Sequence, residues 1–219
     1  MLEQQPLFEA IKAGNADEVN RLTREHPALL KTRDASGASP LLIAIYCQKH
    51  DIATAIASAT GSIDIFEAAA LGRVDRIKQL LREDPSLASA YAPDGFPAVG
   101  LAAFFGHLDA VKALIAAGAD IHAAAKNGLK VQAIHAAVAS KNLDIIRTVL
   151  EAGADPNAVQ QQGFRPMHES GSSGNRELAE LLMKYGGDPT LKNDEGKSTI
   201  AFAREKGHAE FADWLEKRR

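Results

Sequence analysis

The chain has 219 residues, of which 46% are hydrophobic and only 5% aromatic, and its formal net charge of −3 offers no basic surface to nucleic acid. Its single cysteine, Cys47, excludes an internal disulfide and a cysteine-based metal cluster. No apolar run reaches the roughly 18 residues of a membrane span, and residues 1–6 lack the basic and apolar regions of a signal peptide. We therefore expect a cytoplasmic protein with neither a nucleic-acid nor a membrane partner.

One stretch, residues 106–120, sets the pattern for the rest of the chain. Its apolar residues Val111, Leu114 and Ile115 have the spacing of one buried helical face, and Gly118 offers the left-handed residue that ends such a helix. Versions of this stretch begin at seven anchor positions: Gly14, Gln48, Gly72, Gly106, Lys141, Gly174 and Gly207. The intervals are 33–35 residues, except for the second, which is 24 residues. An internal period of this length is typical of a stacked repeat protein.

Each repeat is predicted to contain a short helix, a tight turn at the anchor, a second helix and a loop. A column of small residues four positions before the anchors predicts first helices pressed closely together: Ala10, Ala44, Ala68, Ala102, Ala137, Ser170 and Ala203. We expect one all-α domain, a solenoid whose units contact only their neighbours. The expected repeats are approximately residues 1–33, 34–61, 62–91, 92–125, 126–160, 161–193 and 194–219.

Several motifs resemble those of ankyrin repeats, whose pattern is a turn glycine, T-P-L-H-x-A-A, G-H and an amphipathic helix ending in G-A-D. The similar stretches are Ser39-Pro40-Leu41-Leu42, Arg165-Pro166-Met167-His168, Gly106-His107, Gly207-His208, Gly118-Ala119-Asp120 and Gly153-Ala154-Asp155. The resemblance extends over nearly the full chain and implies an ankyrin-repeat solenoid with β-hairpin or loop fingers. It also implies that partners are held by the finger tips and the exposed side of the first helices.

The 24-residue interval is too short for a complete repeat. The second helix of repeat two leads almost directly to Asp64, which with Glu67 has the spacing of a capping box at the start of the next helix. No room remains for a β-hairpin finger there. We predict one shortened finger between repeats two and three, and a notch in the row of fingers at residues 59–64.

Motifs that suggest chemistry fit the repeat pattern better. Gly196-Lys197-Ser198 ends like a phosphate-binding loop, but Leu191 stands where that motif needs glycine. Four histidines occupy two repeated columns, His107 and His208 in one and His135 and His168 in the other. Equivalent positions in adjacent repeats lie about one repeat apart and cannot meet at the ~2 Å distances of a zinc ion, so we expect these histidines to bond loop backbone. No nucleophile has a base that the repeat geometry would bring near it. We therefore expect no catalytic residue, no cofactor and no metal.

Apolar side chains at the two positions before each anchor collect in repeats two to four and continue into the fingers. An exposed patch of this kind is typical of an interaction site. The predicted partner-binding residues are Tyr46, Leu71, Phe96, Phe104, Phe105, Leu129 and Phe164. The alternative for Phe104 and Phe105 is that one of them packs under a finger as part of the core.

The leading interpretation is a monomeric, non-enzymatic interaction module that binds an unidentified protein or peptide on its concave face, with a regulatory or adaptor subunit as a variant. The alternative is a small-ligand receptor or an unrecognised enzyme that uses the notch beside Tyr46, Leu71 and Ser62. A deep enclosed pocket with convergent polar groups would favour that alternative, and a shallow open groove would remove it.

Overall fold

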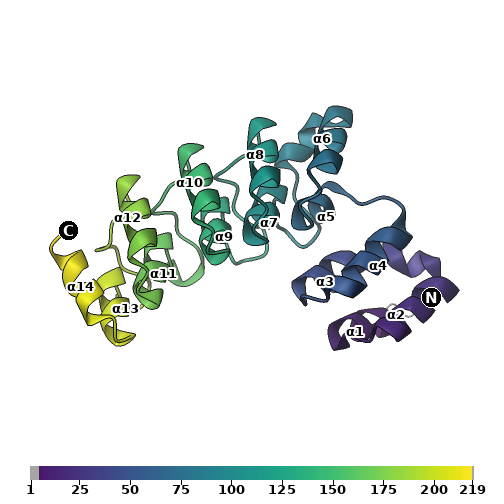
Figure 1. Ribbon diagram of the computed structural model, residues 1–219, viewed down its shortest axis with the longest axis horizontal. Coiled ribbons are helices and arrows are strands. Elements are labelled where there is room, and N and C mark those ends of the chain that lie inside the picture. Colours follow the sequence, from purple (N-terminus) through teal and green to yellow (C-terminus); the bar gives the residue numbers. More distant parts are fainter. Residues whose placement is uncertain (1–4, 219) are drawn as a thin grey trace.

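The computed structural model describes residues 5–218, which form fourteen α-helices arranged as seven successive pairs (Figure 1). The helices are α1 (Gln5–Ala13), α2 (Ala16–Glu25), α3 (Pro40–Tyr46), α4 (His50–Thr60), α5 (Ile65–Ala70), α6 (Val74–Glu83), α7 (Ala98–Phe104), α8 (Leu108–Ala116), α9 (Ala133–Ala139), α10 (Leu143–Glu151), α11 (Pro166–Ser173), α12 (Arg176–Lys184), α13 (Thr199–Glu205) and α14 (Ala209–Glu216). Three short 3-10 helices lie in the loops: η1 (Pro27–Lys31), η2 (Pro85–Ser89) and η3 (Gln161–Gly163). Each of the seven expected repeat ranges contains one α-helix pair.

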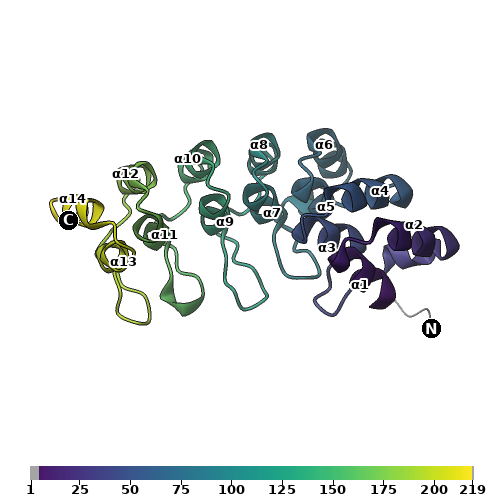
Figure 2. The ribbon, with the colours of Figure 1, turned by 60° about the horizontal axis from the view of Figure 1, so that its bottom comes forward.

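From α5 onward the helices form two parallel rows. The odd-numbered helices make an inner row, the even-numbered helices an outer row, and the connecting loops project beyond the inner row as fingers (Figure 2). Among residues 5–218 strand pairing is limited to two isolated bridges, Tyr91 with Pro97 and Lys192 with Ser198. The prediction of an all-α solenoid is confirmed.

The inner helices pack through the predicted column of small residues. Ala44, Ala102 and Ala137 are 0% exposed, as expected for side chains covered by the neighbouring helix. Ser170 occupies the same column in α11, is also fully buried, and donates its hydroxyl to the Met167 carbonyl at 2.7 Å. Small side chains at these positions let successive helices approach closely enough to exclude voids.

The anchor positions share a backbone conformation as well as a place in the sequence. All seven have a positive φ, from 55° at Gln48 to 82° at Gly207. Glycine adopts this left-handed conformation without steric cost, which explains why five of the seven anchors are glycine. The turn between the two helices of each pair is therefore fixed by backbone geometry.

At two anchors a histidine of the next repeat adds a second requirement for glycine. A Cβ at Gly72 would lie 2.6 Å from Nδ1 of His107, and one at Gly174 would lie 2.7 Å from Nδ1 of His208. The His107 ring is held there by a 3.0 Å hydrogen bond from Nε2 to the Ala70 carbonyl. At Gly106, by contrast, a Cβ would meet no atom within 4 Å.

We expect Gly72→Ala to destabilise the protein more than Gly106→Ala. Both variants force an alanine into the left-handed region, at about 1–2 kcal/mol, but only Gly72→Ala also displaces the His107 ring, at about 1–3 kcal/mol more. Urea unfolding followed by circular dichroism measures both. Equal losses for the two variants would contradict the prediction.

Five loops form fingers, and a backbone hydrogen bond joins the two sides of each finger at its base. The bonds run from the amides of Asp34, Ala92, Ala125, Gln160 and Asn193 to the carbonyls of Ala38, Phe96, Val131, Phe164 and Lys197. From residue 92 onward neighbouring fingers are linked by backbone hydrogen bonds: Lys126 donates to the Gly95 carbonyl at 2.9 Å, Gln161 to the Leu129 carbonyl at 3.0 Å and Asp194 to the Gln162 carbonyl at 3.1 Å. These four fingers form a continuous wall beside the inner helices.

Residues 61–64 form no finger between the second and third helix pairs, as predicted. The flanking fingers close the row, and an open groove remains at residues 61–63 on the α4–α6 side. α4 ends at Thr60 with Gly61 as its left-handed C-cap, and Asp64 already caps α5. The pairs α1–α4 run across the direction of α5–α14 (Figures 1 and 2). This turn brings the two flanking fingers together, so that a Cβ at Gly37 would lie 2.7 Å from the Pro93 carbonyl oxygen.

Glu67 links the second and third helix pairs at the turn between α4 and α5, which we call the joint. The Asp64–Glu67 capping box is present as predicted, with the Asp64 amide donating to Glu67 Oε2 at 3.0 Å. The other carboxylate oxygen accepts the Ser39 hydroxyl of the preceding pair at 2.7 Å. Burial, together with the neighbouring carboxylate of Asp64, raises the pKa of Glu67 above the ordinary value for glutamate.

The raised pKa makes the contribution of Glu67 to stability dependent on pH. Because the folded state holds the proton more tightly than the unfolded chain, this contribution is complete below the ordinary glutamate pKa and is lost as pH rises through the raised value. The free energy of unfolding of the wild type, relative to that of Glu67→Gln, should therefore fall as the pH rises above the ordinary glutamate pKa of about 4.3. Urea titrations at several pH values measure this difference, and a constant difference would contradict the prediction.

Candidate interaction groove

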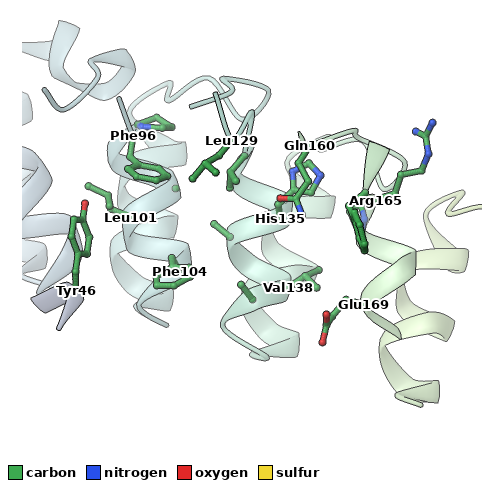
Figure 3. Close-up of a pocket in the computed structure, with 17 residues that line it drawn as sticks. Tyr46, Phe96, Leu101, Phe104, Leu129, His135, Val138, Gln160, Arg165 and Glu169 are labelled. Atoms are coloured by element: carbon green, nitrogen blue, oxygen red, sulfur yellow. The ribbon is translucent and has the colours of Figure 1, made fainter. Parts of the chain in front are cut away.

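A groove of about 530 Å³ lies on the concave side, between the fingers and the inner helices (Figure 3). We call it the concave groove. Its wall is formed by fingers 92–96, 125–131 and 160–164, and its floor by α7, α9 and the start of α11. The side chains that line it are mostly apolar and include Phe96, Leu101, Phe104, Leu129, Val131, Val138 and Phe164.

Five of the seven residues predicted as a partner site line this groove: Tyr46, Phe96, Phe104, Leu129 and Phe164. Phe104 is 51% exposed, which is unusual for a large apolar side chain. Phe105 is half-buried beneath it, with the two rings edge to face at 5.1 Å between centroids. Phe105 packs against the core, as the alternative for this pair expected of one ring, but its stacking partner is the Tyr46 ring and not a finger. Phe104 faces the groove.

Leu71 lies apart from the other predicted site residues. It lines a separate groove of about 760 Å³ between α4 and α6, together with Ser62 and Ala57, and this groove is open to solvent. Tyr46 is not among its lining residues. Leu71 is the C-cap of α5, the first helix after the joint. On the side of the joint, the neighbour of α5 and α6 is α4, which runs across them and not parallel to them (Figure 1).

Tyr46 connects the second helix pair directly to the fourth. Its hydroxyl donates to Asp94 Oδ2 in finger 92–96 at 2.6 Å, and its ring stacks on Phe105 at 5.9 Å. Because residues 61–64 form no finger, no loop lies between Tyr46 and Asp94, and this contact can form. Burial and the Asp94 carboxylate raise the pKa of Tyr46 well above its ordinary value, so the phenol stays neutral and donating.

Gly100 leaves space in the floor of the groove. It lies inside α7 without a positive φ, and a Cβ there would meet only the Pro97 ring, at 3.4 Å and 3.7 Å, within 4 Å. Neither backbone geometry nor packing therefore requires glycine, although glycine weakens a helix by about 0.5–1 kcal/mol relative to alanine. The sequence signal for Gly100 was a glycine inside an expected helix, but Gly100 was not among the predicted site residues.

The histidine at the groove floor is fully engaged by backbone. His135 Nδ1 accepts from the Gln132 amide at 3.1 Å, which leaves Nε2 protonated and donating to the Ala158 carbonyl at 3.0 Å. His168 repeats the arrangement with Arg165 and Leu191. Burial lowers the pKa of both histidines, which favours the neutral ring. The expectation that the repeated histidines bond loop backbone is confirmed for His135 and His168, whereas His107 bonds the Ala70 carbonyl at the end of α5.

Two charged residues stand at the α11 end of the groove and point in different directions. The Arg165 guanidinium is bonded to the Asn157 carbonyl and extends away from the groove, whereas Glu169 points toward α9 (Figure 3). Glu169 is exposed and forms no ion pair with any residue in the range 5–218. Nothing in the sequence singled out Glu169 as a binding residue, because one glutamate among many gives no indication of where it lies in the fold.

Residues 5–218 contain no group of three or more His, Cys, Asp or Glu residues arranged to hold a metal ion. Nor is any helix in this range both long and apolar enough to cross a membrane.

Paired helices, left-handed anchor turns and a wall of fingers define the class of protein, an all-α repeat solenoid. A family model of ankyrin repeats in three copies matches residues 65–160 and 134–218, and the chain belongs to the ankyrin-repeat family. Both matches lie within α5–α14, after the joint, and α1–α4 lie outside them. No curated protein matches the chain.

We expect Tyr46→Phe to lower the free energy of unfolding by about 1.5–3 kcal/mol, because it leaves Oδ2 of the buried Asp94 carboxylate without its donor. The folded-state pKa of Tyr46 is above the unfolded value, so this advantage of the wild type should be complete below about pH 10 and shrink at higher pH. Chemical unfolding of both proteins across that pH range measures it. An advantage that grows above pH 10 would be the contrary result.

Proposed function

We propose that this chain is a monomeric, cytoplasmic, non-enzymatic interaction module that binds a protein or peptide in the concave groove, as a regulatory or adaptor subunit. Ankyrin repeats generally mediate protein–protein interaction. The proposed contact residues are Tyr46, Phe96, Phe104, Leu129 and Phe164, supported underneath by Phe105.

The observation that carries this proposal is the exposure of Phe104 at the centre of an apolar groove. Only two large apolar side chains of residues 5–218 are strongly exposed, Phe104 and Val159, and only Phe104 lines the groove. The Phe105 ring supports Phe104 from one side. An apolar ring held in place and open to water loses little freedom when a partner covers it, so more of the burial energy contributes to affinity.

The small-ligand or enzyme alternative has less support. Its proposed residues Tyr46, Leu71 and Ser62 do not converge, since Tyr46 lines the concave groove and the other two line the open groove beside α4. The Tyr46 hydroxyl and both His135 nitrogens are already bonded within the protein. Such groups are not free to bind substrate or to transfer a proton.

Two variants test the proposal by different physical means. Phe104→Ser removes the exposed ring, while Gly100→Leu adds a side chain that fills the groove floor and improves the helix. Burial of one large apolar side chain is worth about 1.5–3 kcal/mol, so proteins captured by the wild type should be retained at least about tenfold less by both variants. Quantitative mass spectrometry of captured proteins measures this.

Val159→Ser is the matched control, because Val159 is 43% exposed and does not line the groove. It should retain the same proteins as the wild type, with circular dichroism showing that all variants are folded. Unchanged capture by folded Phe104→Ser and Gly100→Leu would refute the groove as the binding site.

A further inference from the structure

We propose that the segment bound in the concave groove carries apolar side chains over Phe104 and Gly100 and a lysine or arginine at Glu169. This inference rests on the proposed function and adds the chemistry of the partner. Its basis is the order in which apolar and charged groups line the groove.

The Gln160 amide, in finger 160–164, lines the groove and makes no side-chain hydrogen bond within residues 5–218, so a polar group of the partner can be matched there. Along α3, α7 and α9 no such group is free: the Tyr46 hydroxyl is bonded to Asp94, and the His135 ring bonds backbone at both nitrogens. A polar group of the partner buried there would lose its water and gain no hydrogen bond, which is unfavourable. An apolar side chain has no such loss.

Gly100 marks the place for one such side chain. Apart from the Pro97 ring, nothing stands within 4 Å of the position that a Cβ would take. Phe96 and Phe104 line the same groove on either side of Gly100 in the sequence, and Leu129 comes from the next finger (Figure 3). An aromatic or branched side chain of the partner can enter this space and bury area against all three.

The charge at the α11 end of the groove selects the partner residue next to this apolar segment. Glu169 extends toward α9 beside Val138, and both residues line the concave groove and also the smaller groove that continues between α9–α10 and α11–α12 (Figure 3). Arg165 is bonded to Asn157 and directed away, so it does not neutralise Glu169. Lys141 lines only the smaller groove and forms no ion pair among the described residues.

Lysine and arginine fit this end because they combine an apolar stem with a terminal charge. The stem can lie over Val138 while the cationic head reaches the Glu169 carboxylate. Partial exclusion of water by the bound segment strengthens the pair, and an acidic residue of a competing segment would be repelled there. Glu169 therefore selects among apolar segments by charge.

The experiment selects short random peptides displayed on phage against the wild type, Glu169→Lys and Glu177→Lys. Glu177 is the matched control, since it is exposed on α12, carries the same charge and lines neither groove. Peptides selected by the wild type and by Glu177→Lys should carry apolar residues followed by Lys or Arg. Glu169→Lys should select Asp or Glu at that place.

Synthetic peptides then give the magnitude. A peptide selected by the wild type should bind Glu169→Lys at least about tenfold more weakly and Glu177→Lys within about twofold, measured by isothermal titration calorimetry. Replacing the basic residue of the peptide with Glu should restore binding to Glu169→Lys. Circular dichroism confirms that the variants are folded.

The outcomes separate this inference from the proposed function. Peptides that lose affinity for Phe104→Ser and Gly100→Leu but are indifferent to Glu169→Lys would refute the charge assignment and leave the groove as the binding site. Peptides that bind Phe104→Ser and Gly100→Leu as well as the wild type, or a selection that enriches no peptide, would refute both.

Discussion

The structure depends on the close packing of inner helices through small side chains. No single helix pair is large enough to bury its own apolar face, so each relies on its neighbours. Ala44, Ala102 and Ala137 have no exposed surface, and at Gly171 a Cβ would lie only 2.4 Å from the Thr199 carbonyl of the next pair. Helices held at this separation place their fingers side by side, and backbone hydrogen bonds between fingers become possible. The concave groove is a consequence of that spacing, because the fingers form its wall and the inner helices form its floor.

The joint after α4 shows what happens when one part of the repeat is missing. Without a finger between the second and third pairs, two side chains supply the connections that loops supply elsewhere. Glu67 caps its own helix and accepts the Ser39 hydroxyl of the preceding pair, much as His135 caps α9 and bonds the following loop. Tyr46 reaches past the third pair to Asp94. Since Tyr46 also forms one end of the groove, the geometry of the proposed binding site depends on this joint.

The chemistry of the groove follows from how its polar groups are used. Hydrogen bonds that hold the fingers and helix starts together consume the polar atoms of Tyr46 and His135, so the surface left for a partner is largely apolar. Phe105 packs inward and supports Phe104, which faces outward. Within residues 5–218, Glu169 has no ion-pair partner and leaves one charge at the end of the groove. A surface of this kind gains affinity from apolar burial and selectivity from a single charge.

The sequence determined the fold because each repeat encodes its own local structure. The tight turns at the anchors, the column of small residues and the Asp64–Glu67 capping box are properties of short stretches, and all were predicted correctly. The sequence also indicated that a finger was missing. Only the tertiary structure decided how the chain closes that gap, because the turn at the joint depends on contacts between residues far apart in sequence, such as Tyr46 and Asp94. The same turn separated Leu71 from the groove, and neighbouring repeats brought Glu169 to its edge. The period of the sequence predicts on which face of its own repeat a residue lies. The side chains that surround the residue depend on how the next repeat is oriented.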